Sequence, residues 1–176
     1  VPPIVRRGFE GVVRNRRPER VVVMPSGSEL GMGVRVRSAP PRVHIDVIGR
    51  RAPAGSHELG RVAFHGPRFD PLTFLADADL AVVNAGFSAI SEMACLRIPM
   101  VVVPIPGHAE QWLNATTVES LGIGRVATEA TWESTMHAML EDLDRYRTAA
   151  ARLDFGTSGA VAAAQAILEL AEERRA

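Results

Sequence analysis

Short apolar runs alternate with longer stretches of helical periodicity along this chain, and the alternation predicts its fold. The runs are rich in Val and Ile and mostly lack polar residues, as in strands covered by helices on both faces. They span residues 21–24, 43–48, 61–64, 80–83, 100–103 and 125–127. Helical patterns span residues 72–76, 88–96, 110–121, 133–140, 143–153 and 159–173. This order predicts an α/β, Rossmann-like domain with a doubly wound parallel sheet of about six strands.

The stretch 29–41 fits this pattern least well. A βα unit calls for a helix there, but Gly31, Gly33, Pro40 and Pro41 all disfavour one. We therefore expect a short or irregular crossover between the first two strands.

Length and composition indicate one domain. The chain has 176 residues and 47% apolar content, enough for a single sizeable core. Residues 1–20 are expected to be an interdomain linker, and residues 21–176 the domain itself. Six arginines crowd into the first twenty positions, where they meet an anionic membrane or keep a linker solvated. The absence of an apolar stripe beside them favours the linker.

Charge and apolar runs also limit the partners and the compartment. The net charge is zero, so no global field attracts nucleic acid. The sequence contains neither an apolar run long enough to span a membrane nor a signal-like start, so we expect a cytoplasmic protein, with peripheral contact at the inner membrane face left open. The single cysteine, Cys95, excludes an internal disulfide and is expected to be a small buried residue.

Candidate chemistry was sought directly after each strand, because ligands of open α/β sheets bind beyond the carboxyl ends of the strands. The first place holds Gly27 and Ser28, where a glycine permits close backbone approach and a hydroxyl can donate to an anion. Ser-Gly clusters are equally typical of ordinary turns.

The second place runs from Asn84 through Gly86 and Phe87 into a helix, with Ser88 as the expected N-cap. The free N–H groups and positive dipole end of such a helix suit a diphosphate. Helical spacing puts Glu92 on the side away from the core. Glu92 is then either a solvated surface residue or the acceptor for two ribose hydroxyls. The second interpretation requires free amides and a Glu92 that is not held in an internal ion pair.

The third place is a Pro- and Gly-rich loop that delivers His108, Glu110 and Gln111 to the same edge of the sheet. Carboxylates and amides suit hydroxyl-rich sugars, but such residues also commonly open a helix, and spacing alone favours neither interpretation.

Two motifs are discounted. Asp77 and Asp79 form a D-x-D, a pattern that can hold a divalent metal, but they precede a strand instead of following one, so no metal is expected. Residues 122–127 imitate a dinucleotide fingerprint, but they join a helix end to a strand and instead predict a helix C-cap.

The run NAGFSAISEMACLRIPMVVVPIPGHAEQWLNA, residues 84–115, resembles the donor-site segment of GT-B glycosyltransferases. It is most similar to the family 28 group, which contains the bacterial N-acetylglucosaminyltransferase of peptidoglycan assembly, and to family 1 antibiotic and glycolipid transferases. The likeness continues upstream through residues 61–83. It implies ribose binding by Glu92 and donor-sugar contacts from Glu110 and Gln111.

The resemblance further implies that Arg68 and Phe69 lie against the base and that Gly27 and Ser28 help to hold the phosphates. Family 1 members often carry a histidine where this chain has Asn84, so phosphate binding would depend more on helix N–H groups and on His108. Retaining family 4 enzymes carry a glutamate there, and its absence favours inverting chemistry.

The function implied is the carboxyl-terminal, donor-binding half of an inverting hexosyltransferase that uses a UDP- or dTDP-sugar and a lipid or natural-product hydroxyl. The general base would lie in the acceptor domain, present in cis or as a separate subunit, so this fragment alone would be inactive and needs no cofactor beyond its donor substrate. Two alternatives stay open: half of a UDP-sugar 2-epimerase, and a non-catalytic interaction module with this fold.

Overall fold

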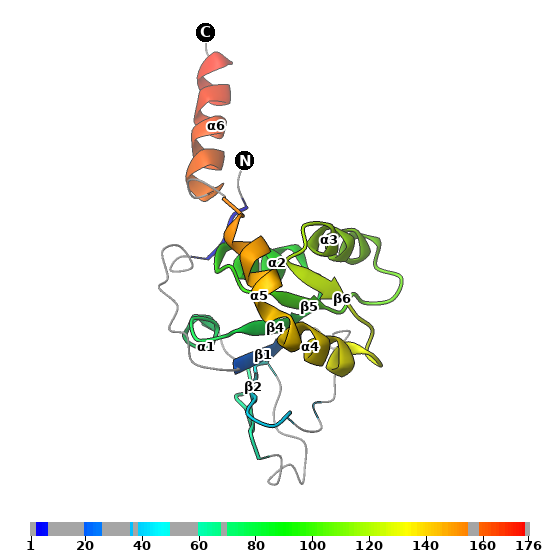
Figure 1. Ribbon diagram of the computed structural model, residues 1–176. Coiled ribbons are helices and arrows are strands. Elements are labelled where there is room, and N and C mark those ends of the chain that lie inside the picture. Colours follow the sequence, from blue (N-terminus) through cyan, green and yellow to red (C-terminus); the bar gives the residue numbers. More distant parts are fainter. Residues whose placement is uncertain are drawn as a thin grey trace.

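A computed structural model describes residues 3–6, 20–25, 36, 39–49, 60–67, 70–154 and 159–174. Six parallel strands form one sheet in the order β3-β2-β1-β4-β5-β6 (Figure 1). The strands are β1 (Arg20–Met24), β2 (His44–Val47), β3 (Val62–Phe64), β4 (Leu80–Val83), β5 (Met100–Val102) and β6 (Gly124–Val126). The helices are α1 (Leu72–Leu75), α2 (Phe87–Cys95), α3 (Ala109–Ser120), α4 (Trp132–Glu141), α5 (Leu143–Ala151) and α6 (Gly159–Glu173).

The strand order confirms the Rossmann-like prediction. The chain builds outward from β1 to β3, then returns to pair β4 with β1 on its other side. The order therefore reverses between β1 and β4, and such a reversal leaves a crevice beyond the carboxyl ends of the two strands.

Helices cover both faces of the sheet, so the strands are apolar on both sides (Figure 1). Val22 and Ala81 belong to a core that includes residues of α1, α2 and α3. Val21 and Leu80, one residue earlier, belong to a second core with α4. This two-sided burial explains why the strands read as continuous apolar runs.

All twelve predicted elements are present, and their ends differ from the expected bounds by at most two residues. Most of the irregular crossover predicted for 29–41 lies outside the described residues. The C-cap prediction is confirmed: Gly122 follows α3 with φ of 68°. At Gly124 an added Cβ would lie 2.1 Å from the carbonyl oxygen of Met100, so only glycine fits this close strand approach.

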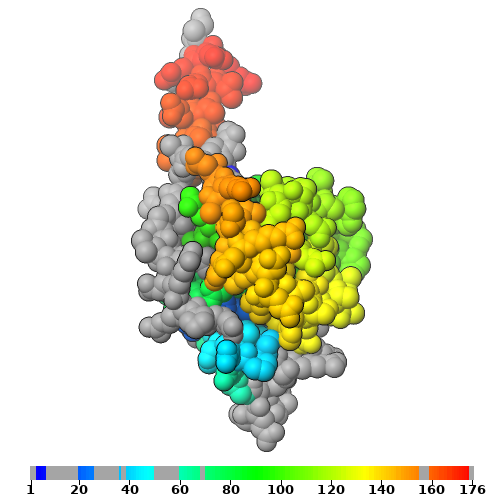
Figure 2. Space-filling view, viewed as in Figure 1, coloured from blue at the N-terminus to red at the C-terminus, as the bar shows by residue number. Residues whose placement is uncertain are grey.

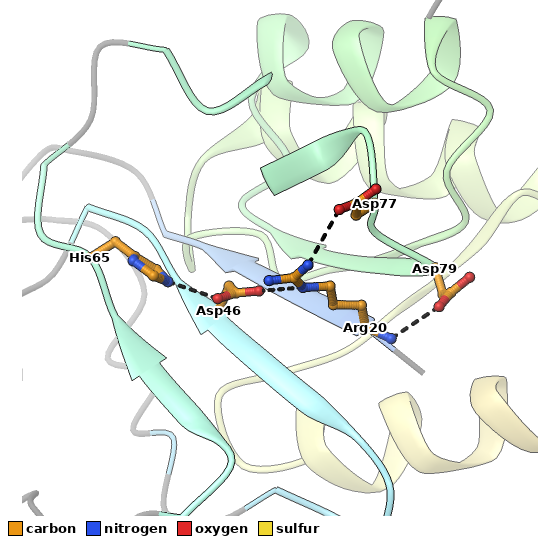
Figure 3. Close-up of polar contacts among 5 residues, drawn as sticks. All are labelled: Arg20, Asp46, His65, Asp77 and Asp79. Carbon is orange, nitrogen blue, oxygen red and sulfur yellow. Dashed lines mark hydrogen bonds and ion pairs between the residues drawn. The ribbon is translucent and has the colours of Figure 1, made fainter. Parts of the chain in front are cut away.

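A network of charged side chains crosses the sheet near the start of β1 (Figure 3). Asp46, in the middle of β2, is buried, and its carboxylate accepts hydrogen bonds from Arg20 Nε at 2.9 Å and pairs with His65 Nε2 at 2.7 Å. A buried carboxylate without partners carries a desolvation penalty of several kcal/mol. Arg20 and His65 therefore compensate a charge that the core would otherwise exclude.

The same arginine engages the D-x-D motif (Figure 3). Arg20 Nη1 donates to Asp77 at 3.3 Å, the Arg20 backbone N–H donates to Asp79 at 3.0 Å, and Arg147 also binds Asp79. Within the described residues, no group of three or more His, Cys, Asp and Glu side chains is arranged to hold a metal. The two carboxylates thus have structural partners at the opposite end of β4 from the crevice.

Among the helices in the described part of the chain, none combines the length and the apolarity needed to cross a membrane. Cys95 is only partly buried, so the expectation of a fully buried residue is wrong.

The charge network around Arg20 leads to a prediction about the stability of the fold. We expect Arg20→Met to lower the free energy of unfolding by about 3 kcal/mol, because it leaves the buried Asp46 carboxylate without its guanidinium partner. Arg145→Met is the matched control, since Arg145 pairs with Asp142 on the surface and should contribute at most about 1 kcal/mol. Urea denaturation of both variants measures the difference, and equal losses would contradict a structural role for Arg20.

Candidate functional site

A cavity of about 830 Å³ lies at the carboxyl ends of the central strands, where the strand order reverses. The residues at the ends of three strands line it: Met24 and Pro25 at the end of β1, Ile48 and Gly49 after β2, and Asn84 and Gly86 after β4. Ser88 and Glu92 of α2 and Gln111 of α3 complete its polar lining, together with Arg6. The fold therefore brings residues from five distant segments to one crevice, as the strand order predicts.

The amino terminus of α2 opens into this cavity without a side-chain cap. Gly86 is the N-cap residue, with extended φ and ψ of −71° and 137°, and it makes no side-chain cap hydrogen bond. Asn114 of α3 donates to the carbonyl oxygen of Ala85 at 3.0 Å and so fixes the loop that precedes the helix. Such a terminus presents backbone N–H donors and the positive end of the helix dipole, which suit an anion.

Asn84 is buried at the end of β4 and lines the cavity. Its amide nitrogen donates to the carbonyl oxygen of Val103 at 3.0 Å, a bond that ties the ends of β4 and β5 together. A neutral amide here adds no charge to the site, so its role is to shape the floor of the cavity.

The position of Glu92 differs from the expectation of an open helix face. Glu92 is only 5% exposed, and its two carboxylate oxygens accept hydrogen bonds from Nε and Nη2 of Arg6 at 2.6 and 2.7 Å. Helical periodicity predicted a Glu92 that faces away from the core, but the side chain is buried beneath Arg6, and no local pattern indicates this contact. The requirement that Glu92 be free of an internal ion pair is therefore not met in this conformation.

Arg6 is the site residue that the sequence interpretation missed. It belongs to the expected linker, yet it lines the cavity and is the one positively charged side chain among the described lining residues. Its hydrogen bonds to Glu92 raise the pKa of Arg6 above the usual arginine value, so it is charged at all physiological pH. Arg6 is one of six arginines in the first twenty residues, and nothing in the local sequence distinguishes it from the other five.

The residues after β5 separate into two groups. Gln111 is buried, lines the cavity, and accepts a hydrogen bond through Oε1 from the backbone N–H of Ile105 at 3.0 Å. His108 is the N-cap of α3, where its Nδ1 accepts from the Gln111 backbone N–H at 3.5 Å, and it faces a different, apolar hollow. Glu110 is exposed in the first turn of α3. Of the three predicted residues, only Gln111 lines the cavity.

Two predictions at the start of α2 need correction. Ser88 is not the N-cap, because the helix begins one residue earlier than expected and Gly86 holds that position. The Phe87 side chain is 57% exposed and lines an apolar groove rather than the cavity, so only its backbone can contribute to the site. The predicted contacts from Gly27, Ser28, Arg68 and Phe69 lie outside the described residues.

Comparisons with known proteins agree with this geometry. Residues 65–169 match the family described as glycosyltransferase family 28 C-terminal domain. Over 174 residues the chain is 29% identical to the UDP-N-acetylglucosamine--N-acetylmuramyl-(pentapeptide) pyrophosphoryl-undecaprenol N-acetylglucosamine transferase of Exiguobacterium sp., covering 95% of this chain and 44% of that protein. Over 53 residues it is 40% identical to an uncharacterized glycosyltransferase of Methanopyrus kandleri, covering 30% of this chain and 15% of that protein.

Solved structures share the fold. The glycosyltransferase SnogD from Streptomyces nogalater aligns with a TM-score of 0.61 at 19% identity, over 81% of this chain and 40% of that one. MurG of Acinetobacter baumannii aligns with a TM-score of 0.57 at 17% identity, over 78% and 45%. The chain thus spans less than half the length of these proteins and of the curated relatives above.

The separation of Gln111 from Glu110 gives a testable difference in stability. We expect Gln111→Leu to lower the free energy of unfolding by about 1–2 kcal/mol, because the Ile105 N–H loses its acceptor. Glu110→Leu, a change on an exposed neighbour, should stay within about 0.5 kcal/mol. Thermal or urea denaturation compares the two, and a neutral Gln111→Leu would show that this bond does not hold the loop after β5.

Proposed function

The chain belongs to the family of glycosyltransferase family 28 C-terminal domains, and from that membership we propose that it is the donor-binding half of an inverting hexosyltransferase. The observation that carries the proposal is the uncapped amino terminus of α2, which opens into a cavity shared with Glu92, Arg6 and Gln111. Backbone amides, a carboxylate, a guanidinium and a carboxamide are the groups that recognise a diphosphate, a ribose and a hydroxyl-rich sugar.

We propose partners in this arrangement for three parts of a UDP- or dTDP-sugar: the diphosphate, the ribose and the sugar. The diphosphate would bind the first-turn amides of α2, and Glu92, about a turn and a half further along the helix, would accept hydrogen bonds from the ribose hydroxyls. Gln111, which lines the cavity at the start of α3, would contact the sugar.

Donor binding must then change the Arg6–Glu92 pair. Glu92 uses both oxygens on Arg6 in the described conformation, so a ribose has to displace at least one of those bonds. A released guanidinium beside the cavity would find a stronger partner in the diphosphate, because charged bidentate hydrogen bonds to phosphate are among the strongest that arginine makes. Arg6 would then supply the positive charge that Asn84 does not.

The proposed reaction is a direct displacement at the anomeric carbon. The acceptor hydroxyl oxygen attacks that carbon and loses its proton to a general base of the acceptor half, while the bond from the carbon to the diphosphate oxygen breaks. The departing diphosphate keeps the electron pair, and the α2 amides and Arg6 stabilise its charge. In this proposal the chain binds and activates the leaving group and contributes no general base.

The acceptor half is itself a proposal. The Exiguobacterium relative is more than twice as long as the region that this chain matches, so the remainder of such a protein has room for a second domain. We propose that this domain binds a lipid or natural-product acceptor, in cis or as a separate subunit, and that transfer requires it.

A non-catalytic module is the second candidate, and the closed Arg6–Glu92 pair is the observation that favours it. A pocket that has lost its ligand would keep this ion pair permanently. The two candidates differ in nucleotide binding, because any ligand specific for the native state raises its melting temperature. A melting temperature that UDP, dTDP and GDP all leave unchanged would support the module.

We expect Glu92 to recognise the ribose through its hydroxyl groups. Wild-type protein should bind UDP about 10- to 100-fold more tightly than 2′,3′-dideoxy-UDP, which corresponds to about 1–3 kcal/mol for the lost hydroxyl bonds. Glu92→Ala should bind UDP and 2′,3′-dideoxy-UDP with equal affinity. Any contribution of the released Arg6 affects both ligands equally and leaves their ratio unchanged. Calorimetric titration gives the ratio, and Glu141→Ala, at the exposed end of α4, is the control that should leave it unchanged. A variant that keeps the wild-type ratio would remove Glu92 from the site.

We expect Arg6 to act on the diphosphate. Arg6→Met should weaken UDP binding by about tenfold and leave uridine binding unchanged or tighter, since uridine lacks the phosphates and Glu92 becomes free. Arg125→Met, on the exposed side of β6, is the matched control. Equal weakening of UDP and uridine would mean that Arg6 only maintains the shape of the cavity.

A further inference from the structure

The described residues that line the cavity differ between its two ends. Polar side chains lie with β4 and β5: Asn84 follows β4, and Gln111 belongs to α3, which follows β5. At the other end, Ile48 follows β2 and Pro67 follows β3, and both are apolar. The strand order separates these ends, since β2 and β3 lie on one side of β1 and β4 and β5 on the other. Figures 1 and 2 show the segment 39–49 and α3 on opposite sides of the domain.

The apolar end of the cavity suits the base of a nucleotide. Its lining consists of Ile48, Gly49, Pro67 and Pro71, called here the apolar wall, and none of them carries a polar side chain. The donor-binding function proposed above puts the diphosphate at α2 and the sugar at Gln111, so the base extends toward this wall. The faces of a base are flat and apolar, and they can pack against proline rings and the Ile48 side chain.

The two halves of the apolar wall are joined through the residue between His65 and Pro67. The Gly49 backbone N–H donates to the carbonyl oxygen of Gly66 at 2.7 Å. Gly66 has a φ of 64°, so the chain turns sharply just before Pro67. The position of Pro67 in the wall therefore depends on how the chain enters this turn, and His65 is the residue that enters it.

Three contacts hold His65, which directly follows β3. Its backbone N–H donates to the carbonyl oxygen of Val47 at 2.9 Å, and its ring Nε2 lies 2.7 Å from Oδ1 of Asp46 (Figure 3). Its ring centroid lies 4.4 Å from that of Phe74 in α1, three residues after Pro71. His65 is not among the residues that line the cavity, so it can act on a ligand only through its neighbours.

The contact with Asp46 ties His65 to a fixed point of the sheet. A carboxylate has no proton to donate, so Nε2 of His65 is the donor of this hydrogen bond. Asp46 is 5% exposed in the middle of β2, and Arg20 Nε donates to its second oxygen at 2.9 Å. Hydrogen bonds to a charged acceptor are stronger than neutral ones, and the acceptor here cannot move away. The ring of His65 therefore keeps one position, and so does the turn that follows it.

We propose that His65 is a positioning residue for the nucleotide base and acts through its hydrogen bond to Asp46. The bond fixes the turn at Gly66 and thereby the apolar wall, and a preformed wall binds a base without the entropic cost of being ordered. The proposal rests on the donor-binding function proposed above. A histidine that only compensated the buried charge of Asp46 would leave base binding unchanged in the folded domain.

The test compares the binding of uridine, UDP and pyrophosphate, followed by NMR titration. His65→Phe keeps a ring beside Phe74 but loses the donor, so uridine and UDP should bind about tenfold more weakly, the factor for one lost charged hydrogen bond. Pyrophosphate, which has no base, should bind with unchanged affinity. His65→Gln, whose amide can still donate to Asp46, should bind all three ligands as the wild type does. So should the matched control, His44→Phe, at the exposed start of β2.

Three results with these variants would overturn the proposal. They are wild-type affinity of His65→Phe for uridine, an equal loss of uridine and pyrophosphate binding in that variant, and a His65→Gln that binds uridine as weakly as His65→Phe. A measurement on the wild-type protein decides the matter if His65→Phe does not fold. Uridine should shift the ring resonances of His65, whereas pyrophosphate should not, and unshifted His65 resonances in the uridine complex would equally overturn the proposal.

The three ligands separate this proposal from the function on which it rests. If all three bind the wild type but His65→Phe binds uridine normally, only the positioning role fails. If pyrophosphate binds and uridine does not, the base site fails together with the role of His65, and the diphosphate site stands. If none of the three binds the wild-type protein, the donor-binding proposal fails, and the role of His65 fails with it.

Discussion

Parallel pairing of β1 with both β2 and β4 is the constraint on which the rest of the structure depends. The carboxyl ends of neighbouring parallel strands all lie at one edge of the sheet. Because the strand order reverses at β1, the loops that follow β1 and β4 run in opposite directions and leave a crevice between them. Residues that follow β1, β2 and β4 can therefore converge on one cavity although they are far apart in sequence. Helix α2 starts at this edge because it must cross back over the sheet, so its free amides face the cavity as a consequence of topology.

Three arginines, Arg6, Arg20 and Arg147, compensate buried carboxylates in this domain, and the surroundings of Arg6 and Arg20 give these two different roles. Arg20 lies within a network that includes Asp46, Asp77 and Asp79, remote from the cavity, where an incoming ligand could not replace it. Arg6 binds the buried carboxylate of Glu92, is about half exposed, and borders open space. An ion pair at the edge of a cavity can exchange partners at little cost, because the charge that leaves one anion gains another. The same chemistry thus stabilises the fold at one end of the sheet and can respond to a ligand at the other.

The sequence predicted the features that depend on residues close together along the chain. Alternating apolar runs and helical periods located all twelve elements, and turn chemistry identified the Gly122 cap. Five residues of the predicted donor site, Asn84, Gly86, Ser88, Glu92 and Gln111, line one cavity. The errors concern orientation and long-range contact: Glu92 is covered by residues 3–6, Phe87 and His108 point into other hollows, and Ser88 is two positions too late to cap its helix. A helical period fixes the direction of a side chain, but it contains no information about a segment 86 residues away that lies over it.

The sheet of this domain is covered by helices of the same chain, whereas part of the domain's surface is apolar and exposed. Its sheet is apolar on both faces and covered on both, and the buried carboxylates of Asp46, Asp79 and Glu92 have partners. Its large exposed apolar side chains lie on segment 3–6, at the start of α2, along and just after α3, and along α6. Three of them, Ile4, Phe87 and Leu121, line one apolar groove, and an exposed apolar surface of this kind is typical of an interface. Because the cavity at the strand ends also opens at the segment 3–6, a partner that covers this groove would at the same time form a wall of the cavity and control the Arg6–Glu92 pair. Domain association and donor recognition would then be two effects of the same few residues.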